Sequence, residues 1–460
     1  YRMRPSTSRA ARSPDSIADS IEWVRTHNSQ KFLEMFYFEY GHASIADLGH
    51  VVLCFEGISE LAATEIEDEQ LWDGQARSSR YQDFGQSGFV IPPDLPPEYA
   101  DAYSATALRL LGAYKQVHAE MVGLLSERLP KPDAMKPEAY RRNIAARAYD
   151  VARYLLFFAI PTGVGQVTSI RTLEKQARRL KASPYEELRT LAAEIVEACA
   201  KPPVCGLSDS PGEPIAPTLA KYVDADEHPR AAQRDLALWA KQNLPARTMD
   251  EPGMMDVLRP DNTQADIAAT LLYPVTDRPF RELYEFASAW TSAMRNEVID
   301  IALGSRSRRD DLLRAFRTTT FAFDMVMDIG AYRDMHRHRR CQQFRQAFTT
   351  SLGFATPELL QGTAVESEYA ARIEESLQLS ESIGRGAGEY LLPFATRSRF
   401  LFKMDFAEAE YMSRLRSGVK GHFSYRQVAW EMKRKLEQIE PDLARLIDAT
   451  PPWIDDPLKR

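Results

Sequence analysis

The sequence is poor in cysteine and offers no framework of disulfides or zinc ligands. Its four cysteines (Cys54, Cys199, Cys205 and Cys341) are scattered, and none belongs to a Cys-x-x-Cys pair. Disulfides are dense in small secreted domains, whereas isolated cysteines are typical of a reducing compartment. The sequence therefore predicts a cytoplasmic protein, and no residue is assigned as a metal ligand.

Long apolar runs and an excess of positive charge are also missing. The longest apolar run, residues 154–160, is far too short to span a bilayer, and no signal-peptide pattern is visible. The net charge is −7, with a pI near 5.8, which argues against a general nucleic-acid binder. These features predict a chain that binds neither membrane nor nucleic acid, and they leave a small anionic ligand as the better match for local basic clusters.

One such cluster stands out in the sequence. Four arginines and two histidines fall within residues 332–340, directly after the apolar run 321–327. Such a cluster repels itself unless an anionic or electron-rich group is held against it. A solvated basic helix face is the alternative, but the apolar run before it favours a buried element that leads into a binding site.

Two segments recur in the same order, which indicates a tandem duplication. Residues 154–159 (YLLFFA) return as residues 390–395 (YLLPFA), and residues 88–92 (GFVIP) return as residues 353–357 (GFATP). The offset shrinks from 265 residues (88 to 353) to 236 residues (154 to 390). The first copy therefore carries roughly thirty extra residues, which we expect among the helices after its proline-rich loop.

The chain of 460 residues, 44% of them apolar, is long enough for two ordinary domains. Long helical segments are interspersed with a few short apolar strands, without regular β–α–β alternation. Each copy ends in an amphipathic helix, and Ser183 is the expected N-cap of the first of these. The pattern predicts an α+β fold of two tandem copies, at residues 1–228 and 229–460, with helices packed over a small sheet in each.

The two copies carry different halves of one motif. Flavin-dependent thymidylate synthases have the signature R-H-R-x-x-S-x-N-E-x-S-x-R-Y. Residues 337–339 (RHR) of the second copy match its start, and residues 78–81 (SSRY) of the first copy match its end. Residues 41–44 (GHAS), ahead of an apolar strand, also look like the family. The chain therefore resembles this family through both copies and over most of its length.

Neither copy holds the whole motif. In the first copy residues 68–70 (DEQ) stand in place of R-H-R, and the internal Ser and Glu have become Asp73 and Ala76. Where the motif has Ser, Asn, Glu, Ser, Arg and Tyr, the second copy instead has Gln342, Phe344, Arg345, Ala347, Thr349 and Thr350. The retained halves are complementary. Because the family builds its sites between subunits, one composite site between unlike copies is favoured over decay in both.

Arginines further along the chain follow the family's spacing. The family has an N-A-R stretch, then an Arg nine residues beyond its Arg and another ten further on. The second copy has Arg416 and Arg426 at this spacing from Ala407. The first copy has Arg171, Arg179 and Arg189, one residue short in the first interval.

The resemblance implies roles for these residues. In the family R-H-R holds the flavin, and S-x-R of a neighbouring subunit binds the phosphate of a deoxyuridine nucleotide, a task for which Arg donors are well suited. The roles so implied are FAD binding by Arg337, His338, Arg339 and Arg171, nucleotide binding by Ser78, Arg80 and Tyr81, and catalysis by Arg416 and by Arg179, which would also hold the nucleotide.

The resemblance further implies a reaction: reductive methylation at C5 of a uracil deoxynucleotide, dUMP to dTMP. Methylenetetrahydrofolate would be the carbon donor, NADPH the reductant, and FAD would do the redox work. A homo-oligomer is implied as well, with a dimer of tandem chains resembling the family's homotetramer. Two alternatives stay open: a flavin enzyme of this fold with another acceptor or another one-carbon or redox reaction, and a non-catalytic nucleotide-binding homologue.

Four weaker candidates remain. Cys341 lies among basic residues that favour a thiolate, but a partly buried inert residue is the better interpretation. Residues 163–166 (GVGQ) resemble a phosphate-cradling turn but lack the Lys-Ser/Thr of a P-loop. His42 and His50 flank a Gly-containing turn without an acidic partner at ligand spacing, so structural roles are favoured over metal binding. His422 lies near the retained arginines of the second copy and is a candidate for ligand contact.

Overall fold

The computed structural model describes residues 47, 49–202, 214–216, 223–245, 253–307 and 310–458. The family-like segment 41–44, with His42, lies outside these residues. The first repeat comprises β1 (His50–Ser59), α4 (Glu60–Glu67), β2 (Trp72–Ala76), α5 (Ala100–Arg128), α6 (Pro137–Ala152), β3 (Pro161–Ser169), α7 (Ile170–Lys181) and α8 (Glu186–Ala200). The helix α10 (His228–Asn243) follows them.

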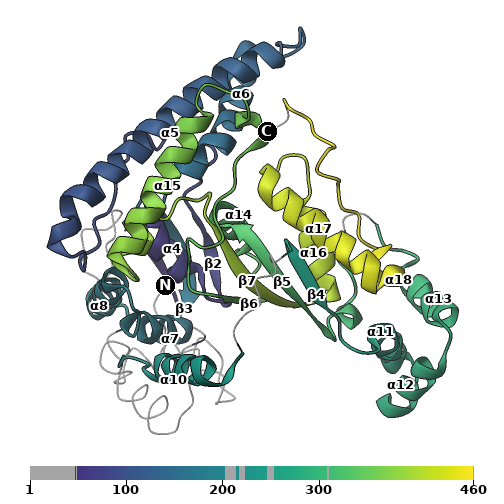
Figure 1. Cartoon of the computed structure of the whole chain (residues 1–460). Coiled ribbons are helices and arrows are strands. Elements are labelled where there is room, and N and C mark those ends of the chain that lie inside the picture. The colour runs from purple at the N-terminus through teal and green to yellow at the C-terminus, as the bar shows by residue number, and fades with distance from the viewer. Residues whose placement is uncertain are drawn as a thin grey trace.

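The second repeat returns to the same order of elements. It comprises β5 (Thr320–Asp328), α14 (Ile329–Met335), β6 (Gln342–Arg345), α15 (Glu366–Ile383), β7 (Arg397–Asp405), α16 (Phe406–Arg416), α17 (Phe423–Ile439) and α18 (Pro441–Ala444). Ahead of it stand β4 (Met255–Leu258), α11 (Thr263–Leu272), α12 (Phe280–Ala289) and α13 (Ser292–Leu303). These three helices protrude at one end of the molecule (Figure 1).

The two antiparallel sheets confirm the predicted duplication and the α+β class. The first sheet has the strand order β1-β3-β2, and the second has β4-β5-β7-β6, so the same three strands recur in the same order. Between the second and third of these strands the first repeat has two helices, α5 and α6, where the second has only α15. The additional helix α6, of 16 residues, and the greater length of α5, 29 residues against 18 in α15, together account for the predicted insertion. The helix α15 lies along α5, so the two repeats are joined on this side as well (Figure 1).

Four strand-to-helix junctions are built in the same way and set the correspondence between the repeats. Each strand ends on a Ser or Asp whose side chain accepts a hydrogen bond from the backbone three residues on, which is the preferred N-cap arrangement. The caps are Ser59 before α4, Asp328 before α14, Ser169 before α7 and Asp405 before α16, with bonds of 2.9, 2.7, 3.2 and 2.9 Å. Counting from these caps matches each residue of one repeat with its counterpart in the other.

The recurring segments 154–159 and 390–395 pair with each other across the molecule. Phe158 N donates to Leu392 O at 3.2 Å, and Phe394 N donates to Leu156 O at 2.7 Å. Two further bonds between the segments are equivalent to each other in the same way. Because each bond has an equivalent with the repeats exchanged, the two copies are related by a local two-fold axis that runs between these segments.

A pair of buried hydroxyl–carboxylate contacts follows the same axis. In one, Ser59 and Tyr390 donate to Glu187 at 2.6 and 2.8 Å. In its equivalent, Ser424 and Tyr154 donate to Asp328. The serine and the acid have exchanged places between the end of the first strand and the start of the last amphipathic helix, α8 or α17. The contact has thus been kept while its residues diverged.

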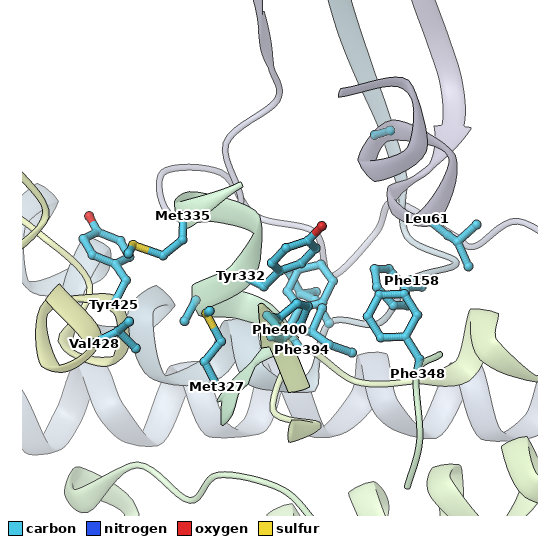
Figure 2. Packing of buried hydrophobic residues seen from close by; sticks show 14 of the residues in the cluster. Leu61, Phe158, Met327, Tyr332, Met335, Phe348, Phe394, Phe400, Tyr425 and Val428 are labelled. Carbon is cyan, nitrogen blue, oxygen red and sulfur yellow. The ribbon is translucent and has the colours of Figure 1, made fainter. Parts of the chain in front are cut away.

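One hydrophobic core contains residues of both repeats. Alternate residues of β5, such as Phe321 and Phe323, are fully buried, as expected for a half-buried strand. Phe158 of the first repeat contacts Phe348 of the second, with ring centroids 4.8 Å apart. Figure 2 shows these rings beside Leu61, with Phe394 and Phe400 further along the same cluster. The two repeats therefore bury apolar surface against each other.

One local prediction is wrong, and one weak candidate is not borne out. Ser183 is not the cap of α8, because the helix begins at Glu186 after Tyr185, and the Ser183 hydroxyl instead accepts from Tyr185 N at 3.2 Å. Residues 163–166 form no phosphate-binding turn but lie inside β3, the central strand of the first sheet. Among the described residues no helix is both long and apolar enough to cross a membrane.

Candidate active site

Arginine side chains from both repeats surround one carboxylate, Asp334. Burial alone would raise the pKa of Asp334, but Arg153, Arg337, Arg416 and Arg80 hold it well below its ordinary value. Arg153 of the first repeat donates to Asp334 Oδ2 at 3.2 Å. Arg80 also belongs to the first repeat, whereas Arg337 and Arg416 belong to the second. The two halves of the divided motif therefore meet between the repeats.

The Arg80 side chain is 10% exposed, and most of its donors already have partners. Its Nε and Nη2 donate to the Asp150 carboxylate at 2.7 and 3.3 Å, Nη2 also donates to Lys420 O at 3.1 Å, and Nη1 donates to Tyr425 OH at 3.0 Å. A guanidinium carries five N–H donors, and these four bonds leave one of them. Arg80 thus contributes mainly its charge and the orientation of Tyr425.

His422, the predicted candidate for ligand contact, has a structural role. The ring is fully buried, its Nε2 donates to Asp150 O at 2.8 Å, and its Nδ1 accepts from Ser424 N at 3.2 Å as the cap of α17. Burial, helped by Arg153 and Arg80, places its pKa well below the ordinary value. Both ring nitrogens are used inside the protein, so His422 fixes α17 against α6.

His338 links Arg416 to an acidic side chain. Arg416 Nε donates to His338 Nε2 at 2.8 Å, so the hydrogen of the neutral ring is on Nδ1, which lies 3.1 Å from Glu408 Oε1. Burial, and then Arg416, lower the pKa of His338, while Glu408 opposes them. The neutral ring has no nitrogen left for a ligand and instead orients Arg416.

Arg337 and Arg339 keep donors available. The Arg337 side chain is exposed, and within the described part of the chain no hydrogen bond or ion pair holds it. Arg339 lies over the Trp72 ring at 5.0 Å and reaches Asp73 Oδ1 at 3.3 Å, while its Nη1 is buried without a partner in the same part of the chain. Unpaired cationic donors are the groups that an anionic ligand would use.

The charges around Asp334 do not cancel. Arg333 belongs to the same group, since it pairs with Glu60 and donates to Ser79 Oγ at 3.1 Å. We define the arginine cluster as Arg80, Arg153, Arg333, Arg337 and Arg416 with the carboxylates of Glu60, Asp150 and Asp334. Within this set five guanidinium groups outnumber three carboxylates, and positive charge stays in excess when Asp328, which also acts on Arg153, is added. The repulsion among the guanidinium groups would be relieved by a ligand of opposite charge, such as a phosphate monoester of about −2.

The equivalent place across the two-fold axis has a different charge. Counted from the helix caps, Asp334 corresponds to Glu65, which pairs with Arg345. Arg179 Nη2 donates to Glu69 Oε1 at 2.8 Å and to Glu65 O at 2.9 Å, and Arg179 Nη1 lies 3.9 Å from Glu65 Oε2. We call Glu65, Glu69, Arg179, Arg345 and Glu389 the counterpart site. Its three carboxylates outnumber its two arginines, and the further charges that act on Glu69 and Glu389 (Asp68, Lys175 and Arg385) leave no excess of positive charge for an anion.

The structure brings some of the predicted site residues together and leaves others apart. Ser78 and Tyr81 flank Arg80: the Ser78 hydroxyl accepts from Arg80 N at 3.3 Å, and the Tyr81 ring lies 5.7 Å from the guanidinium. Arg171 instead pairs with Asp47 at 2.9 Å, on the first repeat. Arg179 is bound within the counterpart site, so the two predicted site residues of α7, Arg171 and Arg179, are both bound away from the arginine cluster.

Several members of the cluster were missed by sequence reasoning. Asp334 was a possible signal, because it is the single acid within the basic stretch. Arg153 offered a second signal, because it directly precedes the recurring segment 154–159. Asp150 and Tyr425 belong to no motif and offered none. The Cys341 thiol is 3% exposed, and burial, followed by Glu408, raises its pKa, which confirms the inert interpretation. No group of described His, Cys, Asp and Glu residues is arranged to hold a metal ion.

The counterpart site predicts a pH dependence of stability. Burial raises the pKa of Glu389 and of Glu69 above 4.5, although Tyr185 and Arg179, respectively, oppose it. A raised folded-state pKa stabilises the fold fully below pH 4.5, and this contribution is lost as the pH rises through the raised value. We therefore expect the unfolding free energy of the wild-type protein to fall between pH 5 and 8. In Glu389→Gln this fall should be smaller, because glutamine does not ionise.

Urea titrations at several pH values measure the slope of unfolding free energy against pH. An unchanged slope would contradict the prediction, and exposed Glu98→Gln is the control.

Comparisons with known proteins match this geometry to a family. A family model described as thymidylate synthase complementing protein matches residues 3–202 and 266–442. The chain belongs to this family. The two matched stretches fall in the two repeats, so each repeat is one copy of the thymidylate synthase complementing protein fold. This family is known for its dependence on flavin.

Relatives that match most of this chain are found in a bacterium and an archaeon. A UPF0159 protein of Chlamydia muridarum is 26% identical over 422 residues, which is 87% of this chain and 77% of the relative. A UPF0159 protein of Thermoplasma acidophilum is 24% identical, over 96% of this chain and 93% of the relative. Among solved structures, a UMP/dUMP methylase of Streptomyces cacaoi bound with 5-Br dUMP is 15% identical, covers 42% of this chain and 95% of its own, and has a TM-score of 0.33.

Proposed function

We propose that the chain is a flavin-dependent enzyme that methylates C5 of dUMP to give dTMP, with methylenetetrahydrofolate as carbon donor and NADPH as reductant. The observation that carries the proposal is the arginine cluster, in which the SSRY segment of one repeat meets the RHR segment of the other around Asp334. The cluster has the charge that a nucleotide monophosphate requires, and its family works on such nucleotides.

The nucleotide phosphate is held by the donors that remain free. Arg337, Arg416 and Arg80 all act electrostatically on Asp334, and within the described part of the chain Arg337, the terminal nitrogens of Arg416 and one N–H of Arg80 have no hydrogen-bond acceptor. Tyr425 OH accepts from Arg80, so its own hydrogen is available to a phosphate oxygen. Charge-assisted bonds of this kind are about twice as strong as neutral ones.

The residues next to the phosphate site fit a flavin. Arg339 stacks on Trp72 and holds a buried, unpaired Nη1 within the described chain, which suits an acceptor-rich anionic cofactor. FAD, when bound, would accept the hydride that NADPH donates. Arg339 and Arg337 bind and orient it, while His338 keeps Arg416 in place. The roles of Arg171 and Arg179 would then be limited to the first repeat and the counterpart site.

One observation favours a second candidate, a flavin enzyme of this fold with a different acceptor. At the motif positions for Asn and Glu the second repeat has Phe344 and Arg345. Phe344 is 54% exposed, and Arg345 is bound to Glu65 in the counterpart site. The groups that would surround the pyrimidine in the family are therefore absent at these places, which affects selectivity for the ring.

The test is a reconstitution with FAD followed by two assays. The proposal expects FAD uptake, flavin reduction by NADPH, and release of tritium from C5-labelled dUMP that depends on methylenetetrahydrofolate. NADPH oxidation without tritium release would support the second candidate instead. Nucleotide binding without any flavin uptake would leave only a non-catalytic homologue and would overturn the proposal.

A further inference from the structure

The turn that presents Arg337 is held by a side chain at a variable position of the motif. Gln343 lies on β6, and its Nε2 donates to His336 O at 3.3 Å and to His338 O at 3.0 Å. These two carbonyl groups belong to the residues on either side of Arg337. A single amide therefore fixes the backbone on both sides of the exposed arginine.

Gln343 is in turn fixed from the core. Because both hydrogens of its amide nitrogen point at carbonyl groups, its Oε1 accepts, and His336 Nδ1 at 2.9 Å carries the hydrogen. The hydroxyl of Tyr332 lies 3.1 Å from the same nitrogen. The Tyr332 ring is stacked on Phe400 with centroids 4.1 Å apart, inside the hydrophobic core (Figure 2). A continuous set of contacts thus connects the rigid core to the turn.

The first repeat has no equivalent of this arrangement. Counted from the helix caps, Gln343 corresponds to Gly74 on β2. A Cβ atom at Gly74 would lie 1.9 Å from Gly165 O, so no side chain fits at that position. The segment that corresponds to the basic turn is residues 68–70 (DEQ), which carries no arginine. The fixing side chain and the arginine turn are therefore present together in one repeat and absent together in the other.

We propose that Gln343 is a positioning residue for the ligand site, which acts by holding the 336–340 turn so that Arg337 faces the arginine cluster. Gln343 itself does not contact the ligand and acts only through the backbone of this turn. This assignment rests on the proposed function for the identity of the ligand, although the conformation of the turn is measurable without any ligand. The favourable contribution comes from preorganisation, because an unrestrained turn would have to be ordered on binding.

The test uses three variants and two readouts. Gln343→Leu removes both the donor and the acceptor at similar volume. Gln343→Glu keeps the acceptor, but when ionised it opposes the two carbonyl groups, and when protonated it regains one donor. Gln342→Leu, on the exposed side of the same strand, is the matched control. Limited trypsin digestion reports cleavage after Arg337 without ligand, and titration with FAD or inorganic pyrophosphate reports affinity.

We expect Gln343→Leu to be cleaved after Arg337 about tenfold faster, and to bind FAD about tenfold more weakly, in line with the loss of two hydrogen bonds to the turn backbone and one with the His336 ring. The Glu variant should recover towards wild type as the pH falls from 8 to 5, which a general loss of stability would not produce. It also gives the comparison if the leucine variant does not fold. Equal cleavage rates for Gln343→Leu and Gln342→Leu would overturn the assignment. Failure of wild-type protein to bind FAD would refute the flavin proposal while leaving the trypsin result decisive.

Discussion

Replacing Arg337 by alanine is expected to weaken binding of dUMP and FAD by about 10- to 150-fold, since charge-assisted bonds contribute about 1.5–3 kcal/mol. The unfolding free energy should stay the same or rise slightly. Arg337 is exposed and holds no partner in the described chain, and Asp334 keeps Arg153, Arg416 and Arg80 nearby. Its removal lowers the repulsion within the arginine cluster. Binding and stability are thus expected to separate.

Isothermal titration with dUMP, together with urea unfolding, measures both quantities. Arg142→Ala, which removes an exposed arginine of α6 away from the cluster, is the matched control and should change neither. If Arg337→Ala bound both ligands as tightly as the control, the assignment of the cluster as an anion site would be wrong. A large loss of stability would equally contradict the claim that Arg337 is held free for a ligand.

The second large effect is expected in the counterpart site. Arg345→Leu should destabilise the fold by about 2–3 kcal/mol, because Glu65 loses the partner with which it is paired. This figure lies below the range for fully buried pairs, since the Arg345 side chain is 24% exposed and Arg179 remains 3.9 Å from Glu65. Affinity for dUMP should be unchanged, because the counterpart site carries no excess positive charge.

A double-mutant cycle with Glu65→Leu checks the physical reason. The double variant, with both partners apolar, should recover most of the stability lost in Arg345→Leu, because no carboxylate is left without its partner. Urea unfolding of the four proteins gives the coupling energy. A coupling near zero would show that the pair does not stabilise the fold. Weakened dUMP binding in Arg345→Leu would show that the counterpart site takes part in function.

Much of the architecture could be predicted from the sequence. The recurring segments revealed the duplication, the shrinking offset revealed the additional helix α6, and the α+β class followed from the pattern of apolar runs. Hydrophobic periodicity and repetition are local signals, and they survive divergence because each repeat must bury the same faces. The predicted start of α8 was wrong: Tyr185, rather than Ser183, precedes the helix.

The composite site was only half predictable. The RHR and SSRY segments indicated that two halves belong together, and the structure brings Arg80 and Arg337 to the same carboxylate. The sequence could not show that residues 154–159 and 390–395 pair with each other, because a repeat does not indicate which copies touch. That pairing brings Arg153 to Asp334. Residues whose roles depend on such long-range contacts carry no local pattern.

The measurement that tests the account most directly is the number of dUMP molecules bound per chain in the FAD-reconstituted protein. A single composite site predicts one dUMP and one FAD per chain, with dUMP binding weakened by Arg337→Ala and unaffected by Arg345→Leu. Equilibrium dialysis with radiolabelled dUMP and flavin absorbance would give both numbers. Two dUMP per chain, or binding that survives Arg337→Ala but not Arg345→Leu, would contradict the claim that only one of the two equivalent places serves as the site.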